Sequence, residues 1–579
     1  MDKLKSAKFK LRLLPCMIFT GLVFPIVHIY SYTLPMSQYI WTSEEDTTVL
    51  YDVFNHCKQT LIVICAVCAI LTLGFLLITA QIKIKRTKLY IPIGIYTAMA
   101  LLSFITSKYK TVAWDGVRYE GTLTILCYII MLFYTIQVLC SLSDIKYLLV
   151  SMFPGLVVSG IIGFSQFIGH DILMTDFGKS ILTMGTDISK DSIEPQFLQG
   201  QVYQTVSNMN YVSMYIVLLF PVIISIIILG IKKSEKKLTI SACVILALMI
   251  ISFIGAKSTS GLVGIGAQLF VFAIILLAMS KPTKFKIPMI CAVCILTLIL
   301  GCFALKYEYG KSVDDINIGY IVTTDDNIKV LIDGEELEIK YDKNADQFSL
   351  SDSDGKSIDV FCFEDEDGIY QVDNINFAGK VRVIPFKQDG SMYIALDFHR
   401  DHFLFRYADD GVKYINPAGN EEILDKVEKR GFAGHYAFGS GRGYIWAATI
   451  PLLKSHVLFG SGAGTFIYEF PQSDYAGKFT GGYVGTIVDK PHNMFLQMFV
   501  TTGGISLIAF LLMSGCVIFL SIKHLKEKKS ENSIRILTVA LILGIFGFLV
   551  TGMFNDTNIS VMPMFYSLLA ILEVIVFMV

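Results

Sequence analysis

Three residues have side chains suited to proton transfer and anion binding, a histidine and two arginines: His492, Arg442 and Arg118. An imidazole titrates near neutral pH and can take a proton from an attacking hydroxyl, so His492 is a candidate general base. Guanidinium groups hold anionic oxygens through charge-assisted hydrogen bonds, which suits the stabilisation of an anionic leaving group. Taken singly, each has a simpler interpretation, as a structural histidine or as an arginine that anchors a membrane surface.

Polar and glycine-rich stretches accompany these residues. They cover residues 114–121, 207–211, 257–261, 441–446, 458–466 and 491–496. Trp114 by itself suits the aromatic belt of a membrane interface. The run Gly460-x-Gly462-x-Gly464 superficially resembles a dinucleotide loop, but no strand–helix–strand frame surrounds it, so we reject that interpretation.

Long apolar runs must position these stretches. Of the 579 residues, 54% are hydrophobic and only 17% are charged. A helix crosses a hydrocarbon core with about 20 apolar residues, and runs of this length recur along the chain. The sequence therefore predicts an all-α polytopic membrane protein with about twelve spanning helices. The predicted spans lie near residues 11–30, 59–81, 89–107, 121–140, 148–168, 211–230, 239–256, 261–280, 287–305, 492–520, 534–553 and 561–579.

Basic residues indicate the orientation of these spans. Alternate loops carry lysine-rich clusters, and the loops between them carry few basic residues. The main clusters lie at residues 83–88, 232–237, 281–286 and 523–529. This is the positive-inside bias, and it predicts that the N- and C-termini are cytoplasmic. Residues 306–491 are then extracytoplasmic, and His492, Arg442 and Arg118 all fall at the outer membrane face.

A segment before the tenth predicted span has a different composition. Residues 306–440 contain 28 Asp and Glu against 15 Lys and Arg. Short alternating stretches are typical of strands, for example Ile328–Ile332, Leu337–Tyr341 and Met392–Leu396. Asp-Gly pairs that fit tight hairpin turns begin at Asp333, Asp354, Asp367, Asp389 and Asp410. The sequence thus predicts an inserted, β-rich extracytoplasmic domain.

Four regions follow from these patterns. They are transmembrane helices one to nine at 1–305, the β-rich insertion at 306–440, an extracytoplasmic loop of the catalytic region at 441–491, and transmembrane helices ten to twelve at 492–579.

Composition also argues against several functions. No strongly basic domain is present, so nucleic acid is not an expected partner. Ion-coupled transporters place charged groups at membrane depth, yet Glu573 is the only clear ionisable residue inside the predicted spans. The Cys-x-x-Cys pairs that begin at Cys65 and Cys291 lie in apolar runs without histidine, so we interpret them as packing residues. No metal and no cofactor is expected.

The order of these stretches resembles the O-antigen ligase and polymerase superfamily of membrane glycosyltransferases, over most of the chain. The strongest matching stretch is Arg442…Trp446…Gly460-Ser461-Gly462…Phe466…His492-Asn493-Met494-Phe495-Leu496…Gly503-Gly504. Supporting matches are Trp114-Asp115-Gly116…Arg118-Tyr119-Glu120-Gly121 and Asn208-Met209-Asn210. The twelve-span plan and the large loop before the tenth span also resemble this superfamily.

The resemblance implies a GT-C-like, metal-independent enzyme of the cytoplasmic membrane. Such an enzyme transfers a glycan from a polyprenyl-diphosphate carrier to an acceptor at the outer face, with inversion at the anomeric carbon. It implies that His492 is the general base and that Arg442 and Arg118 hold the diphosphate. The other substrate-binding candidates are Asn493, Trp446, Lys257, Asn208, Asn210 and Trp114. Expected partners are the lipid-linked glycan, membrane lipid, and a glycan, lipid or protein acceptor whose identity the sequence leaves open.

The chain departs from the superfamily in two places. Ser258-Thr259-Ser260-Gly261 stands in place of Ser-Arg-Gly, and the β-rich insertion at 306–440 exceeds the usual loop. Lys257 is the nearest cation, although it lacks the guanidinium fork. A polysaccharide ligase is slightly favoured, and a repeat-unit polymerase or a protein O-oligosaccharyltransferase stays open. From another class, a glycolipid transporter or flippase is the alternative.

Overall fold

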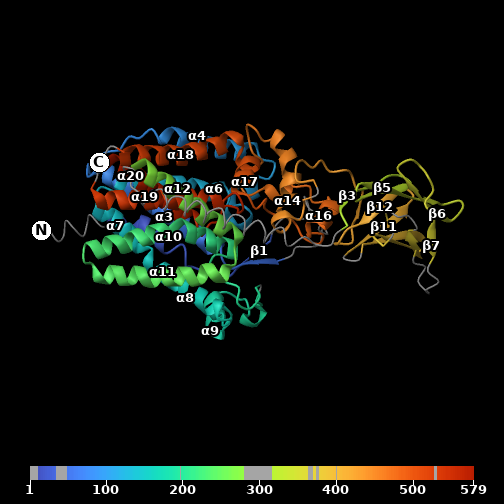
Figure 1. Ribbon diagram of the computed structural model, residues 1–579, viewed down its shortest axis with the longest axis horizontal. Coiled ribbons are helices and arrows are strands. Elements are labelled where there is room, and N and C mark those ends of the chain that lie inside the picture. The colour runs from blue at the N-terminus through green and yellow to red at the C-terminus, as the bar shows by residue number, and fades with distance from the viewer. Residues whose placement is uncertain are drawn as a thin grey trace.

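The computed structural model describes most of the chain. The described residues are 11–33, 49–195, 197–279, 316–362, 370–372, 377, 379–398, 401–433, 435–526 and 531–578. Figure 1 shows two parts along the long axis: a bundle of roughly parallel helices, and a group of strands beyond one end of it. We call the end of the bundle that faces these strands the strand-side end.

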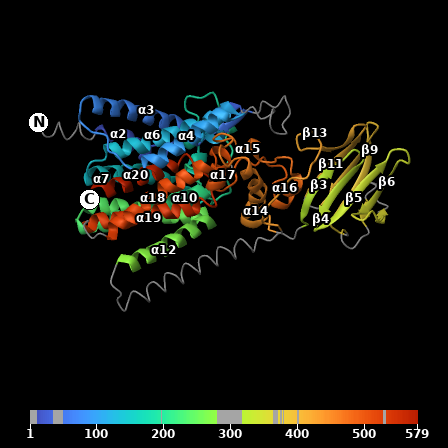
Figure 2. The same cartoon turned by 90° about the horizontal axis from the view of Figure 1, so that it is seen from above.

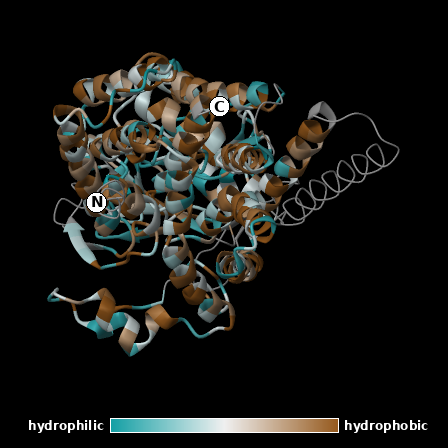
Figure 3. Cartoon of the chain, turned by 90° about the vertical axis from the view of Figure 1, so that its left-hand side faces the viewer, coloured by the Kyte–Doolittle hydropathy of each residue, from teal (hydrophilic) through white to brown (hydrophobic). Residues whose placement is uncertain are grey.

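Long apolar helices make up the bundle. Seven helical segments of the described residues are long and apolar enough to cross a membrane. They are α3 (His56–Ile78), α7 with α8 (Leu142–Ser151 and Phe153–Phe167), α10 (Met209–Lys232), α11 (Lys236–Ala256), α12 (Thr259–Met279), α18 (Gly504–Lys526) and α19 (Asn532–Thr551). Hydrophobic residues dominate most of these helices (Figure 3). The chain is therefore a multi-pass membrane protein, as the sequence predicts.

Further helices are shorter or bent. The segment 110–119, which holds α5 (Lys110–Asp115) and η1 (Val117–Tyr119), meets α6 (Thr122–Val138) at a 69° bend, and the pair adds an eighth span if it is counted as one. Two apolar helices are shorter, α4 (Tyr90–Thr106) and α20 (Met562–Met578). The described residues thus hold fewer long spans than the twelve predicted.

Two predicted spans differ from the structure in form. Within 11–30, the regular helix is only α2 (Leu14–Gly21), because Pro25 cannot continue a helix. The predicted span 492–520 is broken into α17 (Met494–Thr502) and α18 by Gly503, whose φ of 97° lies outside helical geometry. The predicted span 287–305 lies outside the described residues.

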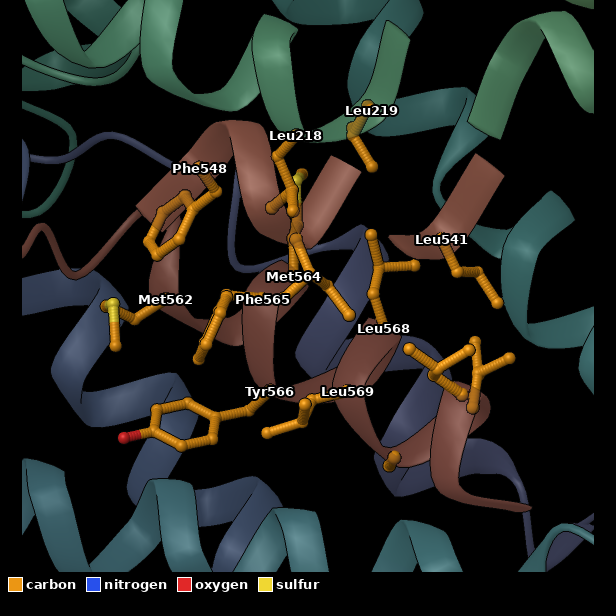
Figure 4. Close-up of a cluster of buried hydrophobic side chains, with 14 of the residues drawn as sticks. Leu218, Leu219, Leu541, Phe548, Met562, Met564, Phe565, Tyr566, Leu568 and Leu569 are labelled. Carbon is orange, nitrogen blue, oxygen red and sulfur yellow. The ribbon is translucent and has the colours of Figure 1, made fainter. Parts of the chain in front are cut away.

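Helix α20 forms the centre of the bundle core. Figure 4 shows Phe565 and Leu568 of α20 among side chains of α10 and α19. The rings of Phe548 and Phe565 stack with centroids 4.6 Å apart. Helices α10 and α19 approach closely at Gly544, where a Cβ would come within 2.2 Å of the Leu218 carbonyl oxygen. A small residue at such a crossing lets two membrane helices pack backbone to backbone.

The strands form two antiparallel sheets with one shared hydrophobic core. The four-stranded sheet has the order β3-β4-β5-β6, and the seven-stranded sheet has the order β13-β12-β11-β10-β9-β8-β7. Their bounds are β3 (Ile318–Thr323), β4 (Asn327–Ile332), β5 (Glu335–Asp342), β6 (Gln347–Asp352), β7 (Val360–Cys362), β8 (Tyr370–Val372), β9 (Arg382–Gln388), β10 (Ser391–Asp397), β11 (His402–Ala408), β12 (Gly411–Ile415) and β13 (Glu421–Glu422). The hairpins at Asp333-Gly334 and Asp389-Gly390 have positive φ at both turn residues, as tight primed turns require.

Short helices connect the strands to the bundle. They are α14 (Phe438–Thr449), η4 (Ile450–Lys454), α15 (Phe466–Glu469) and α16 (Tyr475–Gly481). Figure 2 shows α14 and α16 between the two parts. Helix α16 completes the core of the sheets, because Tyr475, Ala476 and Phe479 are buried in it. A separate hairpin of β1 (Tyr30–Thr33) and β2 (Val49–Asp52) lies at the strand-side end of the bundle (Figure 1).

Candidate active site

His492 pairs with a buried carboxylate at the strand-side end of the bundle. Its Nδ1 lies 2.8 Å from Oδ2 of Asp556, a residue in the loop between α19 and α20. The histidine side chain is 35% exposed, whereas the aspartate side chain is only 1% exposed. The amide of Met494 donates to the carbonyls of Gly552 and Asn555, both at 2.8 Å, and so fixes the two segments against each other. This arrangement leaves Nε2 as the imidazole nitrogen that can take a proton.

The surroundings of Asp556 favour its ionised form. Burial alone would raise the pKa of Asp556, but His492, Lys490 and Arg118 together hold it below the usual aspartate value. The Tyr211 hydroxyl also donates to Oδ2, at 3.5 Å. An ionised carboxylate accepts a hydrogen bond from Nδ1–H, which fixes the tautomer with a free Nε2 lone pair.

Two charge pairs hold the Arg118 loop against the segment that precedes His492. Arg118 Nη2 lies 2.6 Å from Asp489 Oδ2, and the arginine side chain remains 42% exposed. The charge of Asp489 raises the pKa of Arg118. Next to this pair, Lys490 contacts Glu120, and both side chains are buried. The Arg118 guanidinium is therefore anchored by Asp489 and remains partly exposed.

The backbone around Arg118 is unusual. Arg118 and Tyr119 have φ of 63° and 61°, in the left-handed region that residues other than glycine rarely occupy. A glycine contact supports this turn: a Cβ on Gly464 would come within 2.5 Å of the Gly116 Cα. The Gly460–Gly464 loop thus packs directly on the loop that carries Arg118. Non-glycine residues in this conformation cluster at functional sites.

Arg442 and Trp446 approach the site from α14. Trp446 Nε1 donates to the carbonyl of Pro491, directly before His492, at 2.9 Å. Arg442 lies one helical turn earlier, and its Nη1 donates to the Gly439 carbonyl at 2.8 Å. Between the described residues, we find no contact of Arg442 with His492 or Arg118. The structure therefore brings Trp446 to the histidine segment, whereas the hydrogen bond of Arg442 stays within α14.

The two asparagines before the sixth predicted span form a polar chain that reaches the Asp556 loop. Asn208 caps α10 by accepting from the Asn210 amide at 2.8 Å. Ser258 donates to Asn210 Oδ1 at 2.8 Å and lies 2.9 Å from the Ser260 hydroxyl. Asn555 Nδ2 in turn donates to Ser260 at 3.0 Å. The stretch that lacks the superfamily's arginine therefore supplies a hydroxyl network instead.

The remaining predicted site residues either cap a helix or lie exposed at the surface. Asn493 caps α17, because its Oδ1 accepts from the amides of Phe495 and Leu496 at 3.0 and 3.1 Å. Trp114 is partly exposed and packs on Phe104, with ring centroids 5.3 Å apart. Lys257 is exposed, and no ion pair of it is found in the described part of the chain. Within the same ranges, no group of three His, Cys, Asp or Glu side chains could hold a metal ion.

The site also contains residues beyond the predicted set. Asp556 is the most important, and it lies 64 residues after the histidine that it orients. Asp489 and Lys490 stand immediately before the His492 motif, so their position offers a signal. For Asp556, the only signal is its place in a polar loop between two apolar helices.

A family comparison matches the segment that contains His492 and several other residues of the site. Residues 414–511 match the model of the family described as O-Antigen ligase. This segment is similar to an O-antigen ligase domain. It includes Arg442, Trp446 and His492, which confirms the family resemblance seen in the sequence. No curated protein and no solved structure significantly matches the chain. O-antigen ligase family members are glycosyltransferase-like enzymes that act as ligases or polymerases.

Proposed function

We propose that this protein transfers a glycan from a polyprenyl-diphosphate carrier to an acceptor hydroxyl at the outer face of the cytoplasmic membrane. The observation that carries the proposal is the partly exposed His492, oriented by the buried Asp556, inside the segment that matches O-antigen ligases. The exposed Arg118 stands beside this pair, and its charge acts on Asp556. A base and an open cation at one position are the two groups that such a transfer needs.

The reaction is a displacement at the anomeric carbon. The acceptor oxygen forms a bond to this carbon while His492 Nε2 takes the hydroxyl proton. The bond between the anomeric carbon and the diphosphate oxygen breaks, and the diphosphate keeps the electron pair. Attack from the face opposite the leaving group inverts the configuration. A well-placed general base contributes about 10²- to 10⁴-fold to the rate of such a step.

The leaving diphosphate gains negative charge, which arginine donors stabilise. Arg118 Nη2 pairs with Asp489 Oδ2 at 2.6 Å, and the guanidinium has further N–H donors for phosphate oxygens. Arg442 is the second candidate, from α14, and Lys257 is a third. Asn208, Asn210 and Asn493 would act mainly by shaping the loops around the bound glycan. No step of this mechanism uses a metal ion.

The membrane arrangement completes the proposal. Lysine-rich loops on one side support an orientation in which the strand-side end of the bundle lies outside the cytoplasm and both termini lie inside. The β-rich insertion at 306–440 and the loop at 441–491 are then extracytoplasmic, between helices one to nine at 1–305 and ten to twelve at 492–579. A GT-C-like bundle, with its site at the outer ends of the helices, fits this arrangement.

Mass spectrometry of lipid-linked glycans in cells tests the proposal. His492→Ala should swell the polyprenyl-diphosphate-linked pool and remove the surface glycan that the wild type makes. Long accumulated chains would indicate a ligase, and single repeat units a polymerase. His402→Ala, an exposed histidine on β11, is the matched control and should change neither quantity. An unchanged pool with normal surface glycan in His492→Ala cells would contradict the role of His492 and favour a transporter.

A further inference from the structure

Four aromatic rings beside Arg118 have no part in the mechanism above. They belong to Tyr30, Tyr32, His56 and Tyr119, and we call them the aromatic platform. Tyr30 stacks on His56 with ring centroids 3.6 Å apart and an interplanar angle of 9°. Tyr119 meets His56 edge-on at 5.0 Å and Tyr32 edge-on at 5.8 Å. The four rings therefore form one connected group.

Three separate segments build this platform. Tyr30 and Tyr32 come from β1, which pairs with β2 so that Tyr30 lies opposite Asp52. Asp52 accepts hydrogen bonds from the His56 amide and the Asn55 amide, both at 2.7 Å, and so fixes His56 at the start of α3. Tyr119 comes from the turn that follows Arg118. A cluster assembled from a hairpin, a helix start and a left-handed turn has a defined shape.

The platform borders the proposed diphosphate site. Tyr119 follows Arg118 directly in the chain. Burial raises the pKa of Tyr32, and the charges of Asp52, Arg118 and Asp489 also act on its hydroxyl. Tyr32 therefore lies within electrostatic reach of the Arg118–Asp489 pair.

The rings remain accessible. Tyr30 is 41% exposed, and Tyr32, His56 and Tyr119 are only half-buried. Among the residues that the structure describes, no hydrogen bond occupies the hydroxyls of the three tyrosines. Tyr119 is also held at a positive φ, a conformation that costs free energy for any residue with a side chain. Rings that served only to pack the hairpin would be buried further.

We propose that the aromatic platform binds the first sugar rings of the lipid-linked glycan. This inference rests on the proposed function. The anomeric carbon is joined to the diphosphate through one oxygen, so the first sugar must lie next to the cation that holds the diphosphate. The C–H face of a pyranose packs on the electron-rich face of an aromatic ring, and sugar hydroxyls bond to the tyrosine hydroxyls at its edge. The platform thus recognises the glycan of the donor lipid, while Arg118 binds the diphosphate that all such carriers share.

Binding measurements on the full-length protein in nanodiscs test this division. The two probes are bare undecaprenyl diphosphate and the lipid-linked glycan extracted from membranes of the producing cells. Tyr30→Ala combined with Tyr32→Ala should weaken binding of the glycan-bearing lipid about tenfold, and leave binding of the bare carrier within about twofold. Tyr51→Ala, an exposed tyrosine on the same hairpin outside the platform, should change neither. Tyr30→Phe should keep most of the affinity.

The outcomes separate the two proposals. Arg118→Ala should weaken binding of both lipids, and an unchanged affinity for both would contradict the proposed diphosphate role. Equal losses for both lipids in the double tyrosine variant, or no loss for either, would overturn the platform. Wild-type protein that binds neither lipid would overturn both proposals together.

Discussion

The two ends of the bundle hold charged pairs of opposite character. At the end away from the strands, Arg12 and Asp144 lie 2.9 Å apart and both side chains are buried. At the strand-side end, His492 and Arg118 are partly exposed, whereas their partners Asp556 and Asp489 are more deeply buried. A pair whose two side chains are both buried, such as Arg12 and Asp144, holds the segments that carry them together. A pair with one partly exposed member leaves an imidazole or a guanidinium accessible, as the proposed function requires.

The largest expected effect concerns Asp556, the buried partner of His492. Asp556→Asn should lower kcat about 10²-fold or more, because the amide no longer fixes the Nε2 tautomer of His492. The pKa of Asp556 lies below its usual value, so the carboxylate stabilises the fold above the unfolded-state pKa, and this contribution is lost as pH falls through the folded-state pKa. Thermal unfolding of wild type and variant across pH checks this second effect. A kcat close to that of the wild type would mean that Asp556 is only structural.

Changes to the buried Arg12–Asp144 pair should lower the free energy of unfolding without affecting activity or lipid binding. Arg12→Ala leaves the Asp144 carboxylate buried without its partner and should cost about 3–5 kcal/mol in free energy of unfolding. Thermal unfolding in detergent measures this loss, and lipid binding by the protein that remains folded should match the wild type. Reduced affinity for the lipid-linked glycan in that folded fraction would break the distinction between the two ends.

A smaller effect is expected when lysine replaces Arg118, because the positive charge remains but the planar guanidinium is lost. Arg118→Lys can still pair with Asp489, yet it cannot offer a second pair of donors to a phosphate. Binding of undecaprenyl diphosphate should weaken about tenfold, a difference of about 1.4 kcal/mol. Lys426→Arg, a charge-conserving change near β13, is the control. Full affinity in Arg118→Lys would show that charge alone suffices there.

The smallest effect concerns His456, a histidine whose side chain is mostly buried. Burial alone would lower the pKa of His456, but hydrogen bonds to Glu469 and to the Leu452 carbonyl raise it above the usual value. A raised pKa stabilises the fold fully below the unfolded-state pKa, and this stability is lost as pH rises through the folded-state pKa. His456→Gln should therefore destabilise the protein more at pH 6 than at pH 9, by at most about 1 kcal/mol. Equal losses at both pH values would exclude protonation as the cause.

Much of the fold could be predicted because it depends on local patterns. The alternating stretches Ile328–Ile332 and Met392–Leu396 fall within β4 and β10, and Asp-Gly pairs mark the turns between strands. Most of the long apolar runs are helices. The break at Gly503 could not be predicted with the same ease, since a glycine inside an apolar run is often tolerated in a helix.

The site was predictable only in part. The types of His492 and Arg118 indicate a base and a cation, and their chemistry requires no knowledge of their neighbours. Asp556 is different, because its role comes from a loop that packing brings to the histidine across 64 residues. The aromatic platform likewise joins a hairpin, a helix start and a turn, and no single sequence window contains all of these.

The shared core between the sheets and α16 has a consequence for how the chain is made. Tyr475, Ala476 and Phe479 belong to the core of the sheets, although they follow the last strand, which ends at Glu422, by more than fifty residues. A nascent chain that has emerged only through its strands still exposes the hydrophobic surface that these residues cover. The sheets can therefore reach their final stability only once α16 has also emerged, so that folding of the insertion ends after synthesis of the segment that leads to His492 has begun.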